Sequence, residues 1–339
     1  MTVTVRKISL ARAAYALVFF TGSVLLVSFY DTNDHSKQTL KTFKLKCKVM
    51  WPKSSNFFRN GSVGIRENIR PCLPTLWNKP QPVTVEDKWF PSLFLERQHP
   101  ELQDGGSWRP STCRPLQRVA VLVTYRDRPR HLRIMLHHMH PFLQRQNIAY
   151  TIFIIEQTHS TLFNKGMLYN IGFKEALETG SYDCIVLQDL DLLPEDDRIP
   201  YTCTDRPRHM MEARSKDNYR QIYAGNAGGV LSILPKHYMA INGFSNLYFG
   251  WGREDYDFGE RLISSNLTLL RIPPDVGRYK SVWHEHAAEG DMRRKDKLIK
   301  SAAARRFKDG INTLSQGDMY DIACREQTKL FTWILVDIH

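Results

Sequence analysis

The chain has 339 residues, 42% of them hydrophobic, which is enough to bury one sizeable domain and excludes a mostly disordered protein. Its 47 Lys and Arg against 35 Asp and Glu give a net charge of +12, which suits an anionic partner such as a nucleic acid, a membrane face or an anionic substrate. Zinc-finger spacing and the basic and aromatic interleaving of RNA-binding proteins are missing, so we expect no nucleic-acid partner.

An uncharged, mostly apolar run occupies residues 13–30. As a helix it would be about 27 Å long, enough to span a bilayer core. Basic residues precede the run and acidic residues follow it, so the positive-inside rule places residues 1–12 in the cytosol. A cleaved secretory signal is the alternative, but no small-residue cleavage site ends the run. We therefore expect a transmembrane signal anchor of type II, with the rest of the chain in the secretory lumen.

Residues 31–70 are rich in Lys, Ser, Asn and Thr, without a pattern that could build a core. We interpret them as a stem, followed by a single luminal domain at 71–339. Six cysteines and two sequons, at Asn60 and Asn266, fit that oxidising and glycosylating compartment.

The ordered domain begins at Val119–Val123, an apolar run typical of a strand buried on both faces. Apolar residues at helical spacing from Leu132 to Leu143 predict a helix next. The pattern then alternates, which indicates an α/β domain with a parallel, doubly wound sheet. The further segments are a strand at 151–155, a helix around 174–177, strands at 184–187 and 229–234, a helix at 255–264, a strand at 267–272 and an apolar run at 331–338.

Two carboxylates follow the third predicted strand, at Asp189 and Asp191. In an open α/β sheet ligands bind beyond the carboxyl ends of the strands, and residues two apart in extended chain point to the same side. Such a pair can hold a divalent cation, which in turn neutralises a diphosphate. Short acidic turns are more often merely solvated, so this motif alone is weak evidence.

Two histidines, His284 and His286, share one face of an extended segment and could ligate a metal together with Asp191. The alternative is a pair of surface histidines on a polar loop.

A third motif, Gly250-Trp251-Gly252, precedes Glu254 and Asp255 at the start of the predicted helix. Glycines allow close backbone approach to a ligand, Trp offers a flat face for a sugar ring, and acids are favoured at a helix N-terminus. A capped helix with a buried Trp would explain the acids but not the glycine spacing.

From about Cys72 to His339 the chain resembles the metazoan β-1,4-galactosyltransferase family, which implies a GT-A type nucleotide-sugar-binding fold with a mainly parallel central sheet. The segments that carry the resemblance are Tyr125-Arg126-Asp127-Arg128, Phe163-Asn164-Lys165, Asp189-Leu190-Asp191-Leu192-Leu193-Pro194, Tyr201-Thr202-Cys203, Pro207-Arg208-His209, Gly228-Gly229-Val230, Asn242-Gly243-Phe244, Gly250-Trp251-Gly252 and Asp309-Gly310-Ile311-Asn312.

The resemblance implies a site for a UDP-sugar and Mn2+. The metal would be held by Asp191, His284 and His286. The uridine and phosphate site would be lined by Tyr125, Arg126, Arg128, Phe163, Lys165, Asp189, Leu190 and Asp191, with Trp251 against the sugar. Guanidinium groups suit phosphates, and carboxylate with imidazole suits Mn2+ better than Mg2+.

The resemblance also implies an inverting transfer of galactose to a sugar acceptor, in a Golgi membrane. Asp255 would be the general base and Glu254 would assist at the acceptor. Disulfides are implied between Cys72 and Cys113 and between Cys184 and Cys203. An intermolecular disulfide of Cys47 stays open, Cys324 stays unassigned, and a homodimer is neither required nor excluded.

Several residues depart from the family pattern. Lys165 stands where Arg is usual, and Ser281 stands where many members have a metal-binding Met. Asn226 stands where many galactose-using members have a Tyr that crowds the sugar's 2-substituent, so we expect the donor to be UDP-galactose or UDP-GalNAc. We expect the acceptor to end in GlcNAc or xylose, because residues 293–296 resemble the xylose branch and the 184–203 cysteine pair resembles the GlcNAc branch. The rival interpretations are a luminal glycan-binding protein without turnover and a metal-dependent hydrolase.

Overall fold

The structure is a computed structural model that describes residues 7–10, 13–20, 23–29, 69–72, 82–221, 225, 227–285 and 288–339. The chain divides into two units, Met1–Lys48 and Val49–His339, and each is considered by itself.

The first unit contains a three-stranded antiparallel sheet in the order β1-β2-β3, formed by Lys7–Leu10, Ala13–Phe20 and Ser23–Phe29. The helix expected over 13–30 is therefore not what the structure shows. The run is rich in Val, Phe and Tyr, which favour strands, and pairing of neighbouring segments also satisfies the backbone hydrogen bonds. Among the described residues, none of the helices has the length and apolar character that crossing a membrane requires. The expected stem falls almost wholly outside the described residues.

The second unit is built on a sheet of order β12-β9-β11-β7-β5-β6-β15-β14, with β4 paired to β6 beside this path. Its strands are β4 (Ser107–Trp108), β5 (Arg118–Tyr125), β6 (Ala149–Gln157), β7 (Cys184–Gln188), β9 (Arg208–His209), β11 (Val230–Ile233), β12 (Leu270–Arg271), β14 (Tyr320–Gln327) and β15 (Thr332–Ile338). The strands β7, β5, β6 and β15 run parallel, whereas β11 and β14 are antiparallel to their neighbours β7 and β15. This confirms the expected α/β domain with a mainly parallel central sheet.

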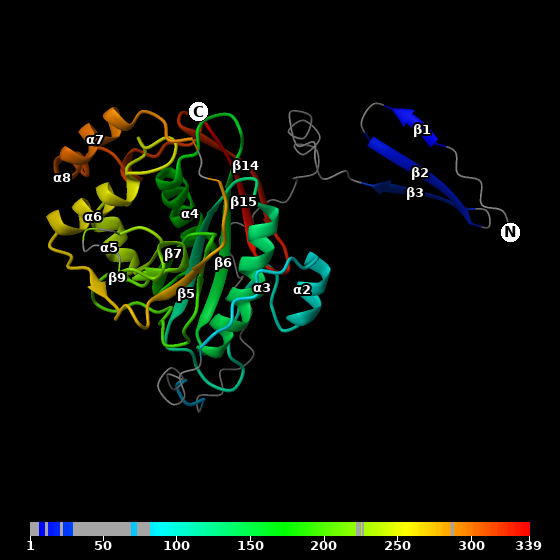
Figure 1. The fold of residues 1–339 in the computed structure, drawn as a ribbon, viewed down its shortest axis with the longest axis horizontal. Coiled ribbons are helices and arrows are strands. Elements are labelled where there is room, and N and C mark those ends of the chain that lie inside the picture. The colour runs from blue at the N-terminus through cyan, green and yellow to red at the C-terminus, as the bar shows by residue number, and fades with distance from the viewer. Residues whose placement is uncertain are drawn as a thin grey trace. The chain divides into compact units, whose positions relative to one another are not determined.

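Helices cover both faces of this sheet (Figure 1). Alternate residues of β5 enter two separate cores: Val121 packs in the core that contains α3, and Leu122 packs in the core that contains α4. This explains why the run Val119–Val123 is apolar without interruption. The helices are α2 (Ser92–Gln98), α3 (Pro129–Arg145), α4 (Lys165–Thr179), α5 (Pro235–Ala240), α6 (Glu254–Ser264), α7 (Met292–Lys300) and α8 (Ala302–Arg305), with 3-10 turns η2 (Ser215–Asp217) and η3 (Ile311–Thr313).

A small second sheet of order β10-β13-β8 lies at the end of β7 and is formed by Ala213–Arg214, Arg278–Ser281 and Leu192–Pro194. The strands β8 and β13 are antiparallel, which brings the chain after Asp191 beside the chain before His284. Two regions far apart in sequence thus meet where β7 ends.

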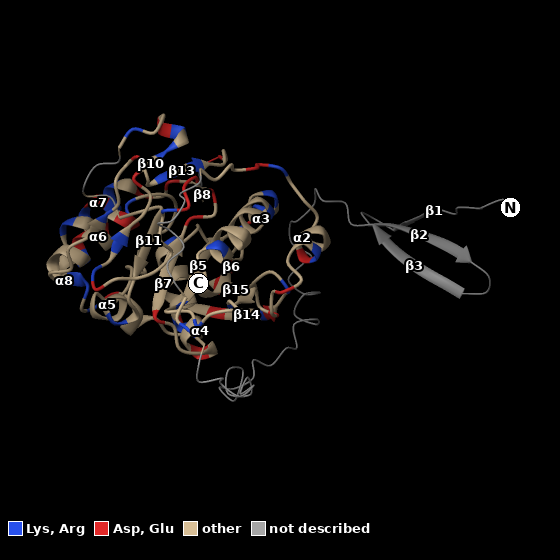
Figure 2. Cartoon of the chain, turned by 90° about the horizontal axis from the view of Figure 1, so that it is seen from below, with Lys and Arg blue, Asp and Glu red and all other residues tan. Residues whose placement is uncertain are grey.

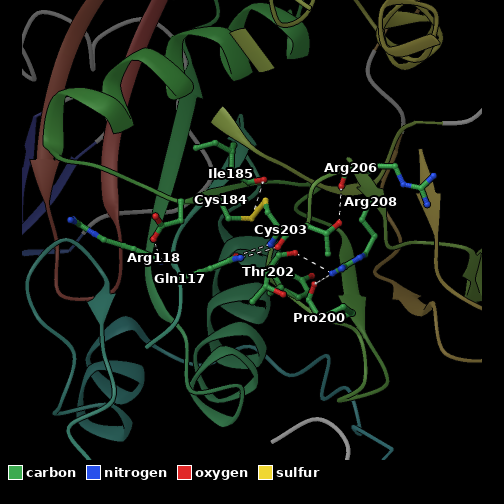
Figure 3. Close-up of a disulfide and its surroundings, with 12 residues drawn as sticks. Gln117, Arg118, Cys184, Ile185, Pro200, Thr202, Cys203, Arg206 and Arg208 are labelled. Carbon is green, nitrogen blue, oxygen red and sulfur yellow. Dashed lines mark hydrogen bonds between the residues drawn. A yellow bond between two sulfur atoms is a disulfide. The ribbon is translucent and has the colours of Figure 1, made fainter. Parts of the chain in front are cut away.

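The disulfides Cys72–Cys113 and Cys184–Cys203 are both formed, as the resemblance implied. The second one ties the first residue of β7 to the loop that follows β8 (Figure 3). Gln117 holds the same loop, because its side chain donates to the Cys203 carbonyl and accepts from the Cys203 amide, both at 2.8 Å. The start of β7, the strand that leads to Asp189, is therefore fixed covalently. Cys324 is also disulfide-bonded, and Cys47 lies outside the described residues.

Candidate functional site

A cavity of about 750 Å3 opens at the carboxyl ends of β5 and β7, where ligands bind in open α/β sheets. Its lining includes the sites expected from sequence: Arg126, Arg128, Phe163, Lys165, Asp189, Leu190, Asp191, Trp251, Glu254, Asp255 and His284. Tyr125 is the exception among the described residues. It is buried in the hydrophobic core, and its neighbour Thr124 lines the cavity instead.

The turn after β7 places Asp189 and Asp191 in the cavity. The Asp189 amide donates to the Gly229 carbonyl at 3.0 Å, and the buried Gln188 side chain donates to the carbonyls of Asp189 and Leu192 at 2.8 and 2.7 Å. Leu190 between the acids is mostly buried. The backbone of the turn is therefore held by its own amide and by the Gln188 side chain, so neither carboxylate is needed to hold it.

Asp191 and His284 lie together, as the sequence predicted. The Val282 amide donates to the Asp191 carbonyl at 2.8 Å, and the His284 Nε2 lies 3.3 Å from Asp191 Oδ2. Burial opposes ionisation of Asp191, but the hydrogen bond and charge of His284 leave its pKa below the usual value. The hydrogen bond to Asp191 in turn raises the pKa of His284.

These groups fit a divalent cation. A carboxylate and an imidazole are established metal ligands, and Ser281, three residues before His284, has a buried hydroxyl without a hydrogen-bond partner. The third expected ligand, His286, lies outside the described residues. Within the part of the chain that the structure describes, no cluster of three or more His, Cys, Asp or Glu side chains is arranged to hold an ion.

Lys165 connects the two acidic parts of the site. It opens α4, and its Nζ lies 2.6 Å from Asp189 Oδ1 and 3.7 Å from Glu254 Oε1. Burial favours the neutral amine and so lowers the pKa of Lys165. The charge of Asp189, with smaller contributions from Tyr169 and Glu254, outweighs burial and raises this pKa above its usual value. The lysine is therefore a fixed positive charge between the end of β7 and the start of α6.

Arg126 and Arg128 follow β5 into the cavity. The Arg126 guanidinium lies 5.2 Å from the centre of the Phe163 ring and donates to the Thr161 carbonyl at 2.9 Å. Arg128 donates to the Glu285 carbonyl at 3.2 Å, beside His284. A flat aromatic ring and two guanidinium groups thus lie along one wall, the combination that suits a base and a phosphate.

The loop Gly250-Trp251-Gly252 brings two acids into the same cavity. Gly250 has φ +78°, and a side chain there would meet the Ala288 carbonyl oxygen at 2.5 Å, which explains the glycine. Trp251 is 47% exposed at the cavity, and α6 then begins with Glu254 and Asp255. Burial and the charge of Glu254 raise the pKa of Asp255 to about 7. A carboxylate with that pKa can accept a proton near neutral pH.

Several functional groups were not foreseen. Arg214 and Lys216 line the cavity from β10 and η2, and the charge of Lys216 helps lower the pKa of Asp191. Nothing in their surface-like sequence pattern indicated this. On the buried side of α6, Arg261 binds Asp257 of the same helix at 2.6 Å and Asp309 at 3.3 Å. The spacing of Asp257 and Arg261, four apart on a predicted helix, was a usable signal for that pair.

Two family models match the chain. The first, the N-terminal region of glycosyl transferase group 7, covers residues 74–204, and the second, the N-terminal domain of galactosyltransferase, covers residues 208–285. Together they include every described candidate residue.

Curated relatives match about three quarters of the chain. Human β-1,4-galactosyltransferase 3 is 40% identical over 261 residues, which are 76% of this chain and 65% of that protein, so the chain spans slightly less than two thirds of that relative. β-1,4-Galactosyltransferase 4 of Cricetulus griseus is 38% identical over 251 residues, which are 73% of this chain and 72% of that protein.

Two solved structures that match the chain are also β-1,4-galactosyltransferases. The catalytic domain of Drosophila β-1,4-galactosyltransferase 7 in complex with xylobiose matches with 26% identity and a TM-score of 0.51, over 66% of this chain and 95% of that chain. A mutant of the same enzyme in complex with manganese, UDP-Gal and xylobiose matches with 27% identity and a TM-score of 0.50, over 66% of this chain and 94% of that chain. The GT-A type fold implied by the sequence is thereby confirmed, and the chain belongs to the β-1,4-galactosyltransferase family.

Proposed function

We propose that this chain is an inverting glycosyltransferase that moves galactose from UDP-galactose to a terminal sugar of a glycan and forms a β-1,4 linkage. The observation that carries the proposal is the convergence of two groups in one cavity. The paired Asp191 and His284 lie at the end of β7, and Asp255 lies at the start of α6 across Lys165. A metal site beside a candidate base is what transfer from a nucleotide sugar requires.

On the donor side, Asp191, His284 and His286 are proposed to hold Mn2+, the ion bound by the Drosophila relative with UDP-Gal. When bound, the ion would neutralise the diphosphate of the leaving group. Arg126 and Arg128 add guanidinium groups that match phosphate oxygens, and Phe163 offers its ring to the uracil. Lys165 supplies a point charge that is held in place by Asp189 and Glu254.

On the acceptor side, Asp255 is proposed to take the proton of the attacking hydroxyl while the oxygen attacks the anomeric carbon from the face opposite UDP. One direct displacement inverts the configuration, so a covalent intermediate is unnecessary. Glu254 raises the pKa of Asp255 and shares Lys165 with Asp189, so it positions the acceptor end of the site. Trp251 offers its exposed ring to the acceptor sugar.

The pH profile follows from the raised pKa of Asp255. Its pKa lies above the ordinary value, so the base is lost as pH falls through about 7. We expect kcat/KM to rise about tenfold per pH unit below that point and to level off above it. Glu254→Gln removes the neighbouring charge, so the midpoint should move to lower pH. Rates measured between pH 5.5 and 8.5 test this, and a midpoint unaffected by Glu254→Gln would contradict the assignment.

The donor is proposed to be UDP-galactose, with relaxed use of UDP-GalNAc. The proposal rests on Asn226, which lies outside the described residues and replaces a larger Tyr. Pocket size alone discriminates by about 1–3 kcal/mol, so Asn226→Tyr should reduce kcat/KM for UDP-GalNAc about 10- to 100-fold and leave that for UDP-galactose within a few-fold. Equal rejection of UDP-GalNAc by wild type and variant would show that another residue sets donor choice.

A Golgi membrane location is proposed as well, with residues 13–30 as the anchor and the catalytic unit in the lumen. It is supported by the charge asymmetry around the apolar run and by the two disulfides, which require an oxidising compartment. Protease protection of the catalytic unit in intact microsomes tests this location.

The sequence leaves the oligomeric state open between a monomer and a homodimer. Sedimentation of the catalytic unit distinguishes the two.

The transferase is distinguished from its rivals by acceptor dependence. We expect UDP release from UDP-galactose to require both Mn2+ and an acceptor that ends in GlcNAc or xylose. A hydrolase would release galactose without acceptor, and a glycan-binding protein would bind the acceptor without releasing UDP.

A further inference from the structure

The helix α7 presents an exposed basic surface beside the cavity. Arg293, Lys297 and Lys300 are spaced i, i+4 and i+7, so they share one face, and all three are exposed. We call these three residues the α7 basic face. Within the described part of the chain, none of them takes part in an ion pair. Figure 2 shows Lys and Arg on α7 and the neighbouring α8.

One of these charges, Arg293, is placed unfavourably for the helix itself. The first turn of α7 contains no acidic residue, although the positive end of the helix dipole favours acids there. Arg293 instead adds positive charge at that end, and the capping Asp291 side chain, which accepts from the Arg294 amide at 3.0 Å, opposes it. Lys297 and Lys300 lie in the last turn, where the dipole favours positive charge, so the stability of α7 accounts for the two lysines but does not explain Arg293.

The basic face is attached to the cavity rim. Met292, the first residue of α7, lines the cavity. The buried Lys295, on the opposite side of the helix, donates to the Trp251 carbonyl at 2.7 Å and to the Glu289 carbonyl. Asp296 pairs with Arg253 at 3.1 Å, immediately before Glu254. The basic face thus begins at Arg293, directly after the cavity-lining Met292, and extends along α7 for about 10 Å on the side of the helix opposite Lys295.

We propose that the α7 basic face binds anionic groups, sulfate esters or carboxylates, on the sugars that precede the terminal sugar of the acceptor glycan. The inference rests on the proposed function, because it takes Trp251, Glu254 and Asp255 as the acceptor side. An acceptor that extends from the cavity over Met292 meets Arg293 first and then the two lysines. Sulfate and carboxylate oxygens match a guanidinium fork and ammonium groups, and the chain's net charge of +12 attracts them at long range.

The test compares three disaccharide acceptors with the same terminal sugar, with UDP-galactose and Mn2+ present. One is neutral, one carries a sulfate ester on the second sugar, and one carries a carboxylate there. GlcNAc-terminated and xylose-terminated series are both run. Wild type should use at least one charged acceptor with a KM about tenfold below that of the neutral one, at equal kcat, and added salt should remove the difference. The charged acceptor with the larger decrease in KM relative to the neutral acceptor identifies the anionic group that the face prefers.

The triple substitution Arg293→Gln, Lys297→Gln and Lys300→Gln should abolish this advantage and leave kcat/KM for the neutral acceptor unchanged. The matched control removes three exposed arginines elsewhere, at Arg70, Arg97 and Arg109, and should keep the advantage. Thermal unfolding of both variants checks that they fold, and the salt dependence of the wild type needs no variant.

Equal KM values for charged and neutral acceptors in wild type would overturn the inference while the proposed function stands. An advantage of the charged acceptors that survives the triple substitution would overturn it as well. If no acceptor is turned over, the proposed function fails, and direct titration with the sulfated and carboxylated disaccharides decides the inference. Binding by the control but not by the triple variant would then support it, and absence of binding by wild type would overturn it.

Discussion

Replacing Asp255 by Asn is expected to lower kcat by about 10²–10⁴-fold while UDP binding stays intact, because the substitution removes the proton acceptor and keeps the shape of the side chain. The site places Asp255 at the start of α6, where burial and Glu254 raise its pKa to about 7. Arg126, Arg128 and Lys165, which are proposed to bind the phosphates, approach from other elements, so they should be unaffected.

The measurement is steady-state kcat together with UDP affinity, by calorimetric titration in the presence of Mn2+. Glu260→Gln, an exposed acid on the same helix, is the control and should behave as wild type. A folded Asp255→Asn protein with near-normal kcat would sink the assignment and point to Glu254 as the base.

Replacing Asp191 by Asn is expected to lower Mn2+ affinity at least about a hundredfold, since removal of an outer partner of a metal ligand already costs 10–100-fold. The amide keeps the volume but loses the charge that attracts the cation and that holds His284 at 3.3 Å. The pKa of His284 should fall toward its ordinary value as well, because Asp191 is what raises it.

Free Mn2+ is measured by electron paramagnetic resonance during titration, which does not depend on turnover. Asp205→Asn, an exposed acid outside the cavity lining, is the control. His286→Ala tests the third ligand in the same assay. Unchanged Mn2+ affinity in His286→Ala would remove it from the ligand set and direct attention to the unpartnered Ser281 hydroxyl.

The sequence was sufficient to predict those helices and strands whose pattern of apolar residues matches the burial seen in the structure. Strand β5 is buried on both faces and is apolar from Val119 to Val123, so its place was predictable. Helix α4 was expected only around 174–177, although it begins at Lys165, because glycines weaken the helix signal in its first half. Gly172 is there for packing: an added Cβ would lie 2.7 Å from Ile155 Cδ1.

Helix α7 was not predicted because the residue that it buries is a lysine, Lys295. A charged residue is normally assigned to the solvent side, so a helix whose buried residue is Lys295 shows no apolar stripe. The bond from Lys295 to the Trp251 carbonyl compensates part of the burial and depends on tertiary structure. The antiparallel strand β14 was missed for a related reason, since its burial is mixed along its length.

Much of the candidate site was predictable because its residues follow strand ends. Asp189 and Asp191 follow β7 directly, and the shared edge of a parallel sheet makes their location a consequence of topology. That His284 reaches Asp191 depends on the pairing of β8 with β13, which no local pattern shows. The contacts of Lys165 with Asp189 and Glu254 likewise join three segments distant in sequence. The burial of Tyr125 was missed because alternation within a strand buried on both faces cannot tell which residue reaches the edge.

The most direct test of the central claim is the structure of the product formed from α-linked UDP-galactose and an acceptor that ends in GlcNAc or xylose. The catalytic unit, Val49–His339, is incubated with Mn2+, and the purified product is examined by nuclear magnetic resonance. The account predicts a new galactose in the β configuration, attached to the 4-hydroxyl of the terminal sugar, with one UDP released per bond formed. An α-linked product, or free galactose released at the same rate without acceptor, would contradict it.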